Sequence, residues 1–314
     1  LGYNGLMVSS KIRPLDILNE SQLSEIRQKN DLRNIFALLF DWGLMIIGLY
    51  AFYNYPSFLS FFASLVVIGS RQFALAVLAH DGAHNLLFSN SKINDFMSQW
   101  FCAYPIFQDN RVYRPYHLKH HRFTETENDP DLSLSAPFPI TKKSFFRKVL
   151  RDITGVTGYK RYSSSLVSVL NTEANNTPEK IQKIWSKIHG FLIVNLTIFV
   201  LISLFFHWSL FFLLWWLPAF TYYSLIIRIR NIAEHCVTPG ESDFDITRTT
   251  RASLIMRFLL APHRVNFHLE HHLFMMCPWY NLPKAHSMMI ENGYKDKMCL
   301  ENSYRSVLTK AVSA

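Results

Sequence analysis

The stretch FLSFFASLVVIGSRQFALAVLAHDGAH, residues 58–84, runs from an apolar segment directly into a pair of histidines. Its first part, Phe58–Ala79, is long enough to cross a bilayer as a helix, since ~20 helical residues cover ~30 Å. If the helix continues past the membrane, His80 and His84 lie on one of its faces, four residues apart. The stretch therefore predicts a long helix that leaves the membrane and presents two imidazoles beyond it.

Three further stretches are apolar and long enough to span: Asn34–Tyr53, Ile188–Phe206 and Leu210–Arg228. Very short connections, 54–57 and 207–209, join the spans in pairs and force antiparallel hairpins. Neither connection contains Lys or Arg, whereas every Lys and Arg except Arg71 lies on, or at the boundary of, the opposite side. By the positive-inside rule that basic side is cytoplasmic. We therefore expect an all-α integral membrane protein with four transmembrane helices in two hairpins and a cytoplasmic histidine-rich helical cap.

Composition agrees with this organisation. Hydrophobic residues make up 49% of the chain, yet Lys and Arg exceed Asp and Glu by 32 to 23. The membrane explains the excess of positive charge, so nucleic acid is not expected as a partner. The expected N-terminal segment (1–33) is cytoplasmic and amphipathic, with a helix from Pro14 to Arg33. The two transmembrane hairpins are expected at 34–79 and 188–230. Between them lies a cytoplasmic segment with two histidine groups and interfacial helices (80–187), and after them a cytoplasmic C-terminal cap with the remaining ligands (231–314).

Two charged residues, Asp41 and Arg71, fall inside the first and second spans. An isolated charge there costs about 2.5–3.5 kcal/mol or more. Both lie seven or eight residues from the cytoplasmic ends, so an antiparallel hairpin places them at similar depth. We predict that they pair; the alternative is that Arg71 extends alone to the membrane surface and Asp41 faces a cavity.

Nine of the thirteen histidines form four tight groups. On a helix, residues i, i+3 and i+4 share a face, so each HxxHH should present three imidazoles together. Neutral imidazole suits iron, copper and zinc. One metal takes three or four such ligands, so nine histidines plus the amide of Asn231 predict a binuclear site with an open position. The expected ligands are His80, His84, His117, His120, His121, His235, His268, His271 and His272.

Nitrogen-rich ligation leaves two metals strongly cationic, so nearby carboxylates should accept imidazole N–H bonds. We favour Asp129 and Asp131, in the sequence Asn-Asp-Pro-Asp. His263 and His286, which flank the last group, are expected to lie outside the site, and His189 and His207 at membrane interfaces. The other candidate carboxylates are Asp81, Glu125, Glu127, Glu234 and Glu270.

With these motifs the chain resembles the membrane fatty acid desaturase superfamily, over roughly Leu75 to His286. The resemblance rests on the four histidine groups, with Asn231-x-x-x-His235 as the third. It extends through Thr124…Asp129-Pro130-Asp131-Leu132 and Pro278…Asn281-Leu282-Pro283. It implies a non-haem di-iron centre with nine histidine ligands and Asn231 reaching a metal through water. It also implies O2 and two electrons as co-substrates, and attack on an unactivated C–H bond of an acyl chain. No catalytic residue separate from the two metals is assigned.

The leading hypothesis is O2-dependent oxidation of a long-chain fatty acyl substrate, most simply desaturation. Oxidative decarboxylation of a free fatty acid to a terminal alkene and hydroxylation of a lipid or carotenoid use the same first step. A dizinc lipid hydrolase and a metal transporter are the non-oxidative alternatives. The chain has no cytochrome b5-like His-Pro-Gly-Gly motif, so a separate electron donor of ferredoxin, rubredoxin or cytochrome type is expected. Its compactness favours a bacterial inner membrane over the endoplasmic reticulum.

Overall fold

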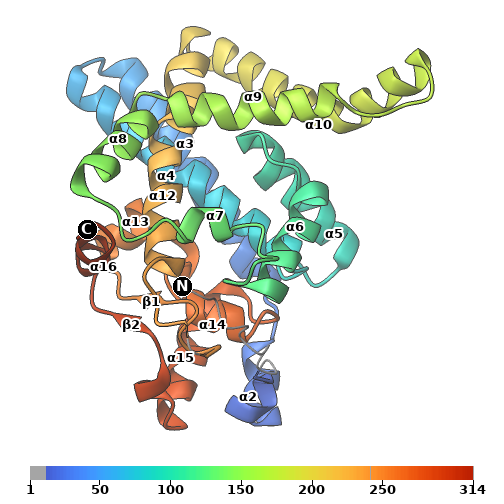
Figure 1. Cartoon of the computed structure of the whole chain (residues 1–314). Coiled ribbons are helices and arrows are strands. Elements are labelled where there is room, and N and C mark those ends of the chain that lie inside the picture. Colours follow the sequence, from blue (N-terminus) through green and yellow to red (C-terminus); the bar gives the residue numbers. More distant parts are fainter. Residues whose placement is uncertain (1–11, 241, 314) are drawn as a thin grey trace.

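The computed structural model describes residues 12–240 and 242–313, and these residues are mostly helical (Figure 1). Four helical stretches are apolar and long enough to cross a membrane. They are Glu20–Asn54, Phe58–Ala83, Thr177–Phe205 and Phe211–His235. The elements of the first half are α1 (Pro14–Ile17), α2 (Glu20–Ile26), α3 (Asp31–Asn54), α4 (Phe58–Ala83), α5 (Ser91–Met97), the π-helix η1 (Ser98–Ala103), η2 (Tyr104–Ile106), α6 (Asn110–Phe123), α7 (Leu132–Ser135) and α8 (Lys142–Ile153).

Helix α4 is the centre of the packing, against α3 on one side and α12 on the other. The Ser64 hydroxyl donates to the Gly48 carbonyl at 2.8 Å, which ties α4 to α3. A side chain at Gly69 would collide with the Tyr222 ring, 2.8 Å from an added Cβ, so glycine permits the close approach to α12. As predicted, helix α4 continues beyond the apolar span; it ends at Ala83, so His80 lies within it and His84 is its C-cap residue.

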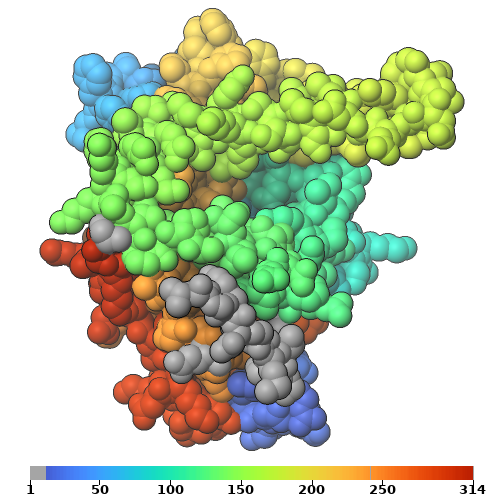
Figure 2. All heavy atoms as spheres, in the orientation of Figure 1, coloured from blue at the N-terminus to red at the C-terminus, as the bar shows by residue number. Residues whose placement is uncertain are grey.

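The elements of the second half are α9 (Val156–Leu170), α10 (Thr177–Phe205), the π-helix η3 (Phe211–Trp216), α11 (Leu217–Phe220), α12 (Tyr222–His235), β1 (Thr249–Thr250), α13 (Leu254–Leu259), η4 (Pro262–Arg264), α14 (His268–Leu273), η5 (Trp279–Asn281), α15 (Leu282–Glu291), η6 (Lys295–Lys297), β2 (Leu300–Glu301) and α16 (Tyr304–Ala311). The two short strands pair in parallel, Thr249 with Leu300 and Thr250 with Glu301. Around α9 and the start of α10 the surface projects beyond the rest of the molecule, on the right of Figure 2.

The fourth apolar stretch differs from the single helix expected over Leu210–Arg228. It consists of η3, α11 and α12, with a break at Thr221 (φ −104°, ψ −84°). Pro218 lies within this stretch and lacks the N–H that a regular α-helix needs, which accounts for irregular bonding around it. Beyond the break α12 is regular to His235, so it still carries Asn231 and His235 one turn apart.

The N-terminal segment also differs from expectation, because two short helices replace the single helix from Pro14 to Arg33. Asn19 separates them and caps α2, its side chain accepting from the Gln22 N–H at 2.9 Å. Leu23 and Ile26 of α2 pack in one buried cluster with Leu269 and Leu273 of α14. The N-terminal helices therefore support the helix that carries the last histidine group. Residues 1–11 of the expected segment lie outside the described residues.

Asp41 of α3 and Arg71 of α4, the residues predicted to pair, form a buried ion pair in which Arg71 Nη1 donates to Asp41 Oδ1 at 3.0 Å. His263 of η4 binds the other carboxylate oxygen at 2.7 Å, and Arg71 also donates to the Phe258 carbonyl. The ion pair thus joins the first two apolar helices to the C-terminal part of the chain.

Candidate metal centre

Nine histidines from four helices meet in the middle of the molecule, where the ends of α4 and α12 approach α6 and α14 (Figure 1). Their ring nitrogens form two groups, and within each group the ligand atoms lie within 4.8 Å of one another. The group of five contains His80, His84, His117, His121 and His271; the group of four contains His120, His235, His268 and His272.

The expectation that each HxxHH presents its three imidazoles together is wrong. His117 and His121 join the group of five, but His120 between them joins the group of four. In α14, His268 and His272 join the group of four, and His271 joins the group of five. At ~100° per residue, positions i and i+4 are nearly aligned, whereas i+3 and i+4 diverge by ~100°. Each of these helices therefore contributes to both groups, which fixes the groups relative to one another.

The ring nitrogens are spaced as ligands of a common ion would be. In the group of five, Nε2–Nε2 distances are 3.0 Å for His84–His117 and 2.9 Å for His117–His121 and His121–His271. In the group of four they are 2.9 Å for His235–His268 and 3.1 Å for His268–His272. Two nitrogens that each lie about 2.1 Å from one metal ion, with an N–metal–N angle of about 90°, are about 3.0 Å apart. The donor set therefore fits two metal ions.

Burial favours the neutral form of several of these imidazoles, and ligation requires a neutral ring. Desolvation lowers the pKa of His84 to about 3. For His117 and His121 on α6, burial and then the neighbouring imidazoles lower the pKa well below its ordinary value. The same causes act on the three histidines of α14: His268, His271 and His272. Each of these rings therefore carries a proton on only one of its two nitrogens at physiological pH.

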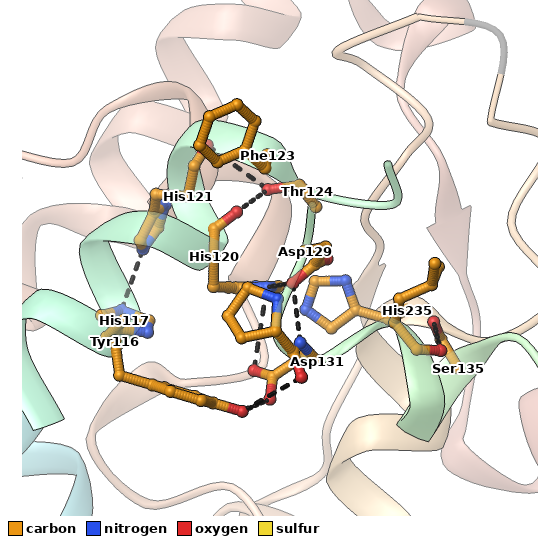
Figure 3. A network of polar contacts seen from close by, with 12 residues as sticks. Tyr116, His117, His120, His121, Phe123, Thr124, Asp129, Asp131, Ser135 and His235 are labelled. Carbon is orange, nitrogen blue, oxygen red and sulfur yellow. Dashed lines mark hydrogen bonds and ion pairs between the residues drawn. The ribbon is translucent and has the colours of Figure 1, made fainter. Parts of the chain in front are cut away.

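Asp129 orients His120, as Figure 3 shows. Its Oδ1 lies 2.8 Å from His120 Nδ1, and both side chains are buried. An ionised carboxylate only accepts hydrogen bonds, so Nδ1 carries the proton and Nε2 keeps the lone pair for a metal. Burial acts to raise the pKa of Asp129, but the hydrogen bond from His120 and two backbone N–H bonds outweigh it and lower the pKa.

Asp131 and Tyr116 extend this network (Figure 3). Asp131 Oδ2 lies 3.7 Å from His120 Nδ1, and the Tyr116 hydroxyl donates to Asp131 Oδ1 at 2.5 Å. Burial and the Asp131 contact raise the pKa of Tyr116, so its hydroxyl stays a donor. Tyr116 is not among the residues predicted for the site, although its position on α6 directly before His117 was an available signal.

Other polar groups surround the outward nitrogens of the same two groups. Asp81 lies 3.5 Å from His80 Nδ1, Glu125 3.7 Å from His235 Nδ1, and Glu234 3.7 Å from His268 Nδ1. The Thr124 hydroxyl lies 3.3 Å from His272 Nδ1 and was not predicted. Arg230, also missed, binds both oxygens of Glu234 at 2.5 Å; the i, i+4 spacing on α12 was the signal for that pair.

The two remaining candidate carboxylates are either paired elsewhere or exposed. Glu270 is fully buried, but it accepts from His286 Nδ1 at 2.5 Å and from the Thr249 hydroxyl. His263 binds Asp41, as described above. Glu127 is exposed and, among the described residues, makes no side-chain hydrogen bond or ion pair. Asn231 lies on α12, one helical turn before His235.

Replacing Asp129 with asparagine should weaken metal retention by about 10–100-fold, because such supporting carboxylates raise ligand basicity and fix the tautomer. Metal lost against a graded series of chelator concentrations measures the effect. Glu127→Gln is the matched control: an exposed carboxylate in the same loop, expected to leave retention unchanged. Equal retention in Asp129→Asn and wild type would remove Asp129 from the centre.

Comparison with known proteins agrees with these motifs. The family model described as fatty acid desaturase matches residues 56–299, which include all nine histidines. The chain is also 26% identical over 292 residues to dihydrorhizobitoxine desaturase from Bradyrhizobium elkanii, covering 87% of this chain and 80% of the relative. The chain therefore belongs to the membrane fatty acid desaturase superfamily, and it is an oxidoreductase of fatty acid desaturase type.

Proposed function

We propose that the protein is a membrane-bound di-iron enzyme that uses O2 and two electrons to desaturate a long-chain fatty acyl substrate. The observation that carries the proposal is the convergence of nine histidines, seven buried and two half-buried, into groups of five and four. Family membership supports an acyl lipid as substrate, and the name of the relative supports desaturation as the reaction.

The proposed ligands follow the two groups. One iron would be held by His80, His84, His117, His121 and His271, and the other by His120, His235, His268 and His272, with Asn231 through water. When bound, two irons with an open position supply the capacity to activate O2 and abstract hydrogen from a C–H bond. Imidazole rather than carboxylate ligation favours iron or zinc over magnesium or calcium.

The protein's own residues contribute orientation, proton placement and exclusion of water. Asp129 keeps the proton of His120 on Nδ1. The Thr124 hydroxyl can accept a hydrogen bond from Nδ1–H of His272 while it donates one to the His120 carbonyl at 2.8 Å. Both arrangements leave Nε2 free to ligate. Arg230 offsets part of the negative charge of buried Glu234 beside His268. Burial of the rings keeps bulk water from the ligands and reactive species from side reactions.

We also propose the membrane topology of two hairpins, α3–α4 and α10 to α12, in a bacterial inner membrane with the histidines on the cytoplasmic side. The connections 55–57 and 206–210 contain no Lys or Arg. They carry exposed Tyr55 and Trp208, aromatic residues that favour the membrane interface. The cap then comprises residues 80–187 and 231–314, which hold all the proposed ligands.

Cysteine labelling tests this topology. In a Cys299→Ser background, an impermeant thiol reagent added to intact cells should modify Pro56→Cys and Trp208→Cys. Lys295→Cys, on the cap, should react only after the membrane is permeabilised, because a helical hairpin returns to its starting side. Labelling of Lys295→Cys in intact cells would reverse the orientation.

A separate donor must deliver the two electrons. Lys119 and Arg122 lie exposed on α6 next to ligand histidines, so an acidic carrier of ferredoxin, rubredoxin or cytochrome type could approach there by electrostatic steering. The enzyme test combines purified protein, a reduced carrier and O2 with acyl-CoA, free acid, glycerolipid and dihydrorhizobitoxine substrates. Mass spectrometry should show loss of two hydrogens from an acyl chain. A terminal alkene or an added oxygen would instead assign decarboxylation or hydroxylation, and product formed without O2 would exclude all three.

A further inference from the structure

A surface groove of about 560 Å³ lies between α8, α12, α13 and α16, apart from the histidine groups. Its volume is within the range of about 300–1,000 Å³ typical of small-molecule sites. Six of its ten lining residues are apolar side chains, and none is acidic. These six are Phe145, Ile229, Met256, Leu260, Leu308 and Val312.

The groove carries two cations, Lys142 at the start of α8 and Arg305 in the first turn of α16. Both are exposed, and within residues 12–240 and 242–313 neither forms an ion pair. The acidic residue nearest in sequence to Arg305 is Glu301, and it is occupied by Lys310 and by the Ser306 hydroxyl at 2.7 Å. The charge over this apolar lining is therefore uncompensated and favours an anionic ligand.

The surroundings of the groove fit a lipid environment. On α8, Phe146 and Leu150 are 66% and 45% exposed beside Arg147 and Arg151. On α13, Leu254 and Ile255 are 76% and 66% exposed. A basic helix with exposed apolar side chains is typical of one lying in a membrane interface. The groove would then open where amphiphiles with a charged head and an alkyl chain are available.

Tyr304, one of the lining residues, is near enough to Glu234 to be affected by its charge. Tyr304 is buried, and burial, with a smaller effect of the Glu234 carboxylate, raises its pKa, so its hydroxyl stays protonated. Glu234 in turn lies 3.7 Å from His268 Nδ1. Ile229, on the α12 wall, is two residues before Asn231.

We propose that this groove binds a free fatty acid, with its carboxylate against Lys142 and Arg305 and its alkyl chain along the apolar lining. A fatty acid matches each feature: one anionic head, one alkyl chain and access from the membrane interface. The site is distinct from the histidine groups, and its occupancy does not depend on the reaction that they perform.

Photolabelling tests the proposal. Protein in phosphatidylcholine nanodiscs is irradiated with a straight-chain fatty acid that carries a diazirine, and labelled peptides are mapped by mass spectrometry. Label should fall on peptides containing 142–145 and 304–312. Lys142→Glu with Arg305→Glu should reduce that label at least about tenfold, since two charge-assisted contacts are lost. Thr309→Trp, an exposed position that fills the groove without changing charge, should also reduce it.

The controls separate this site from the other proposals. Lys92→Glu with Lys295→Glu makes the same charge change at exposed positions elsewhere and should leave labelling unchanged. The metal-site variant His120→Ala should label like wild type, so a failed enzyme assay leaves this test intact. Label that is insensitive to both groove variants would overturn the proposal. Competition by lysophosphatidate but not by unlabelled fatty acid would also overturn it, assigning the groove to a phosphate headgroup.

Discussion

Replacing either His271 or His272 with alanine should lower turnover at least about 1,000-fold. Each change removes one ligand from a different group, although the two residues are adjacent in sequence. Loss of a residue that merely supports a ligand costs about 10–100-fold, so loss of a ligand itself should cost more. The proposed reaction needs both metals, so either loss suffices. Steady-state product formation with saturating acyl substrate, carrier and O2 measures it.

Histidines outside the groups provide the control. His189 is half-buried and His207 is exposed, and their ring nitrogens bond to the Trp185 carbonyl and the Ser209 hydroxyl, respectively. Alanine at either position should leave turnover within about twofold of wild type, the range expected for surface substitutions. If His272→Ala retained wild-type turnover while His271→Ala lost it, only the group of five would be functional.

Asp41→Ala should destabilise the protein by about 3–5 kcal/mol, because it leaves the buried Arg71 charge without its carboxylate. It also deprives His263 of its 2.7 Å partner. The measurement is the thermal unfolding midpoint in a mild detergent, followed by intrinsic fluorescence. Asp16→Ala is the control, because the Arg13–Asp16 pair has a similar distance, 2.9 Å, but lies on the surface. No midpoint change is expected there.

Exchanging the two charges, with arginine at 41 and aspartate at 71, should restore only part of the lost stability. The exchange re-forms the ion pair, but it places an arginine against His263 and removes the donor to the Phe258 carbonyl. Comparable midpoints for Asp41→Ala and Asp16→Ala would show that the intramembrane pair contributes little.

Much of the fold follows from local patterns in the chain. Apolar length located the four spanning stretches, because a bilayer demands about 20 apolar residues whatever surrounds them. The exact geometry of the helices was harder to predict from the sequence. The π-helix Phe211–Trp216 and the break at Thr221 depend on how neighbouring helices satisfy the backbone around Pro218. The split of Pro14–Arg33 into two helices depends on packing against α14 and α15.

The histidines of the site could be named from the sequence, but their division into two groups could not. His120 and His121 are neighbours in sequence, and only the placement of α12 and α14 decides which group each joins. The role of Asp129 could be predicted from the sequence because it lies nine residues from His120 in a polar loop. The Asp41–His263 contact joins residues 222 positions apart, and no local pattern signals it.

Iron and zinc content per chain, in protein purified from iron-supplemented cells, tests the central claim most directly. Nine histidine ligands in two groups predict about two irons per chain in wild type, and substantially less in both His120→Ala and His271→Ala. Two zinc ions per chain that persist under iron supplementation would contradict the di-iron assignment and favour hydrolysis. Protein that is folded and active with no stoichiometric metal would contradict the metal centre itself.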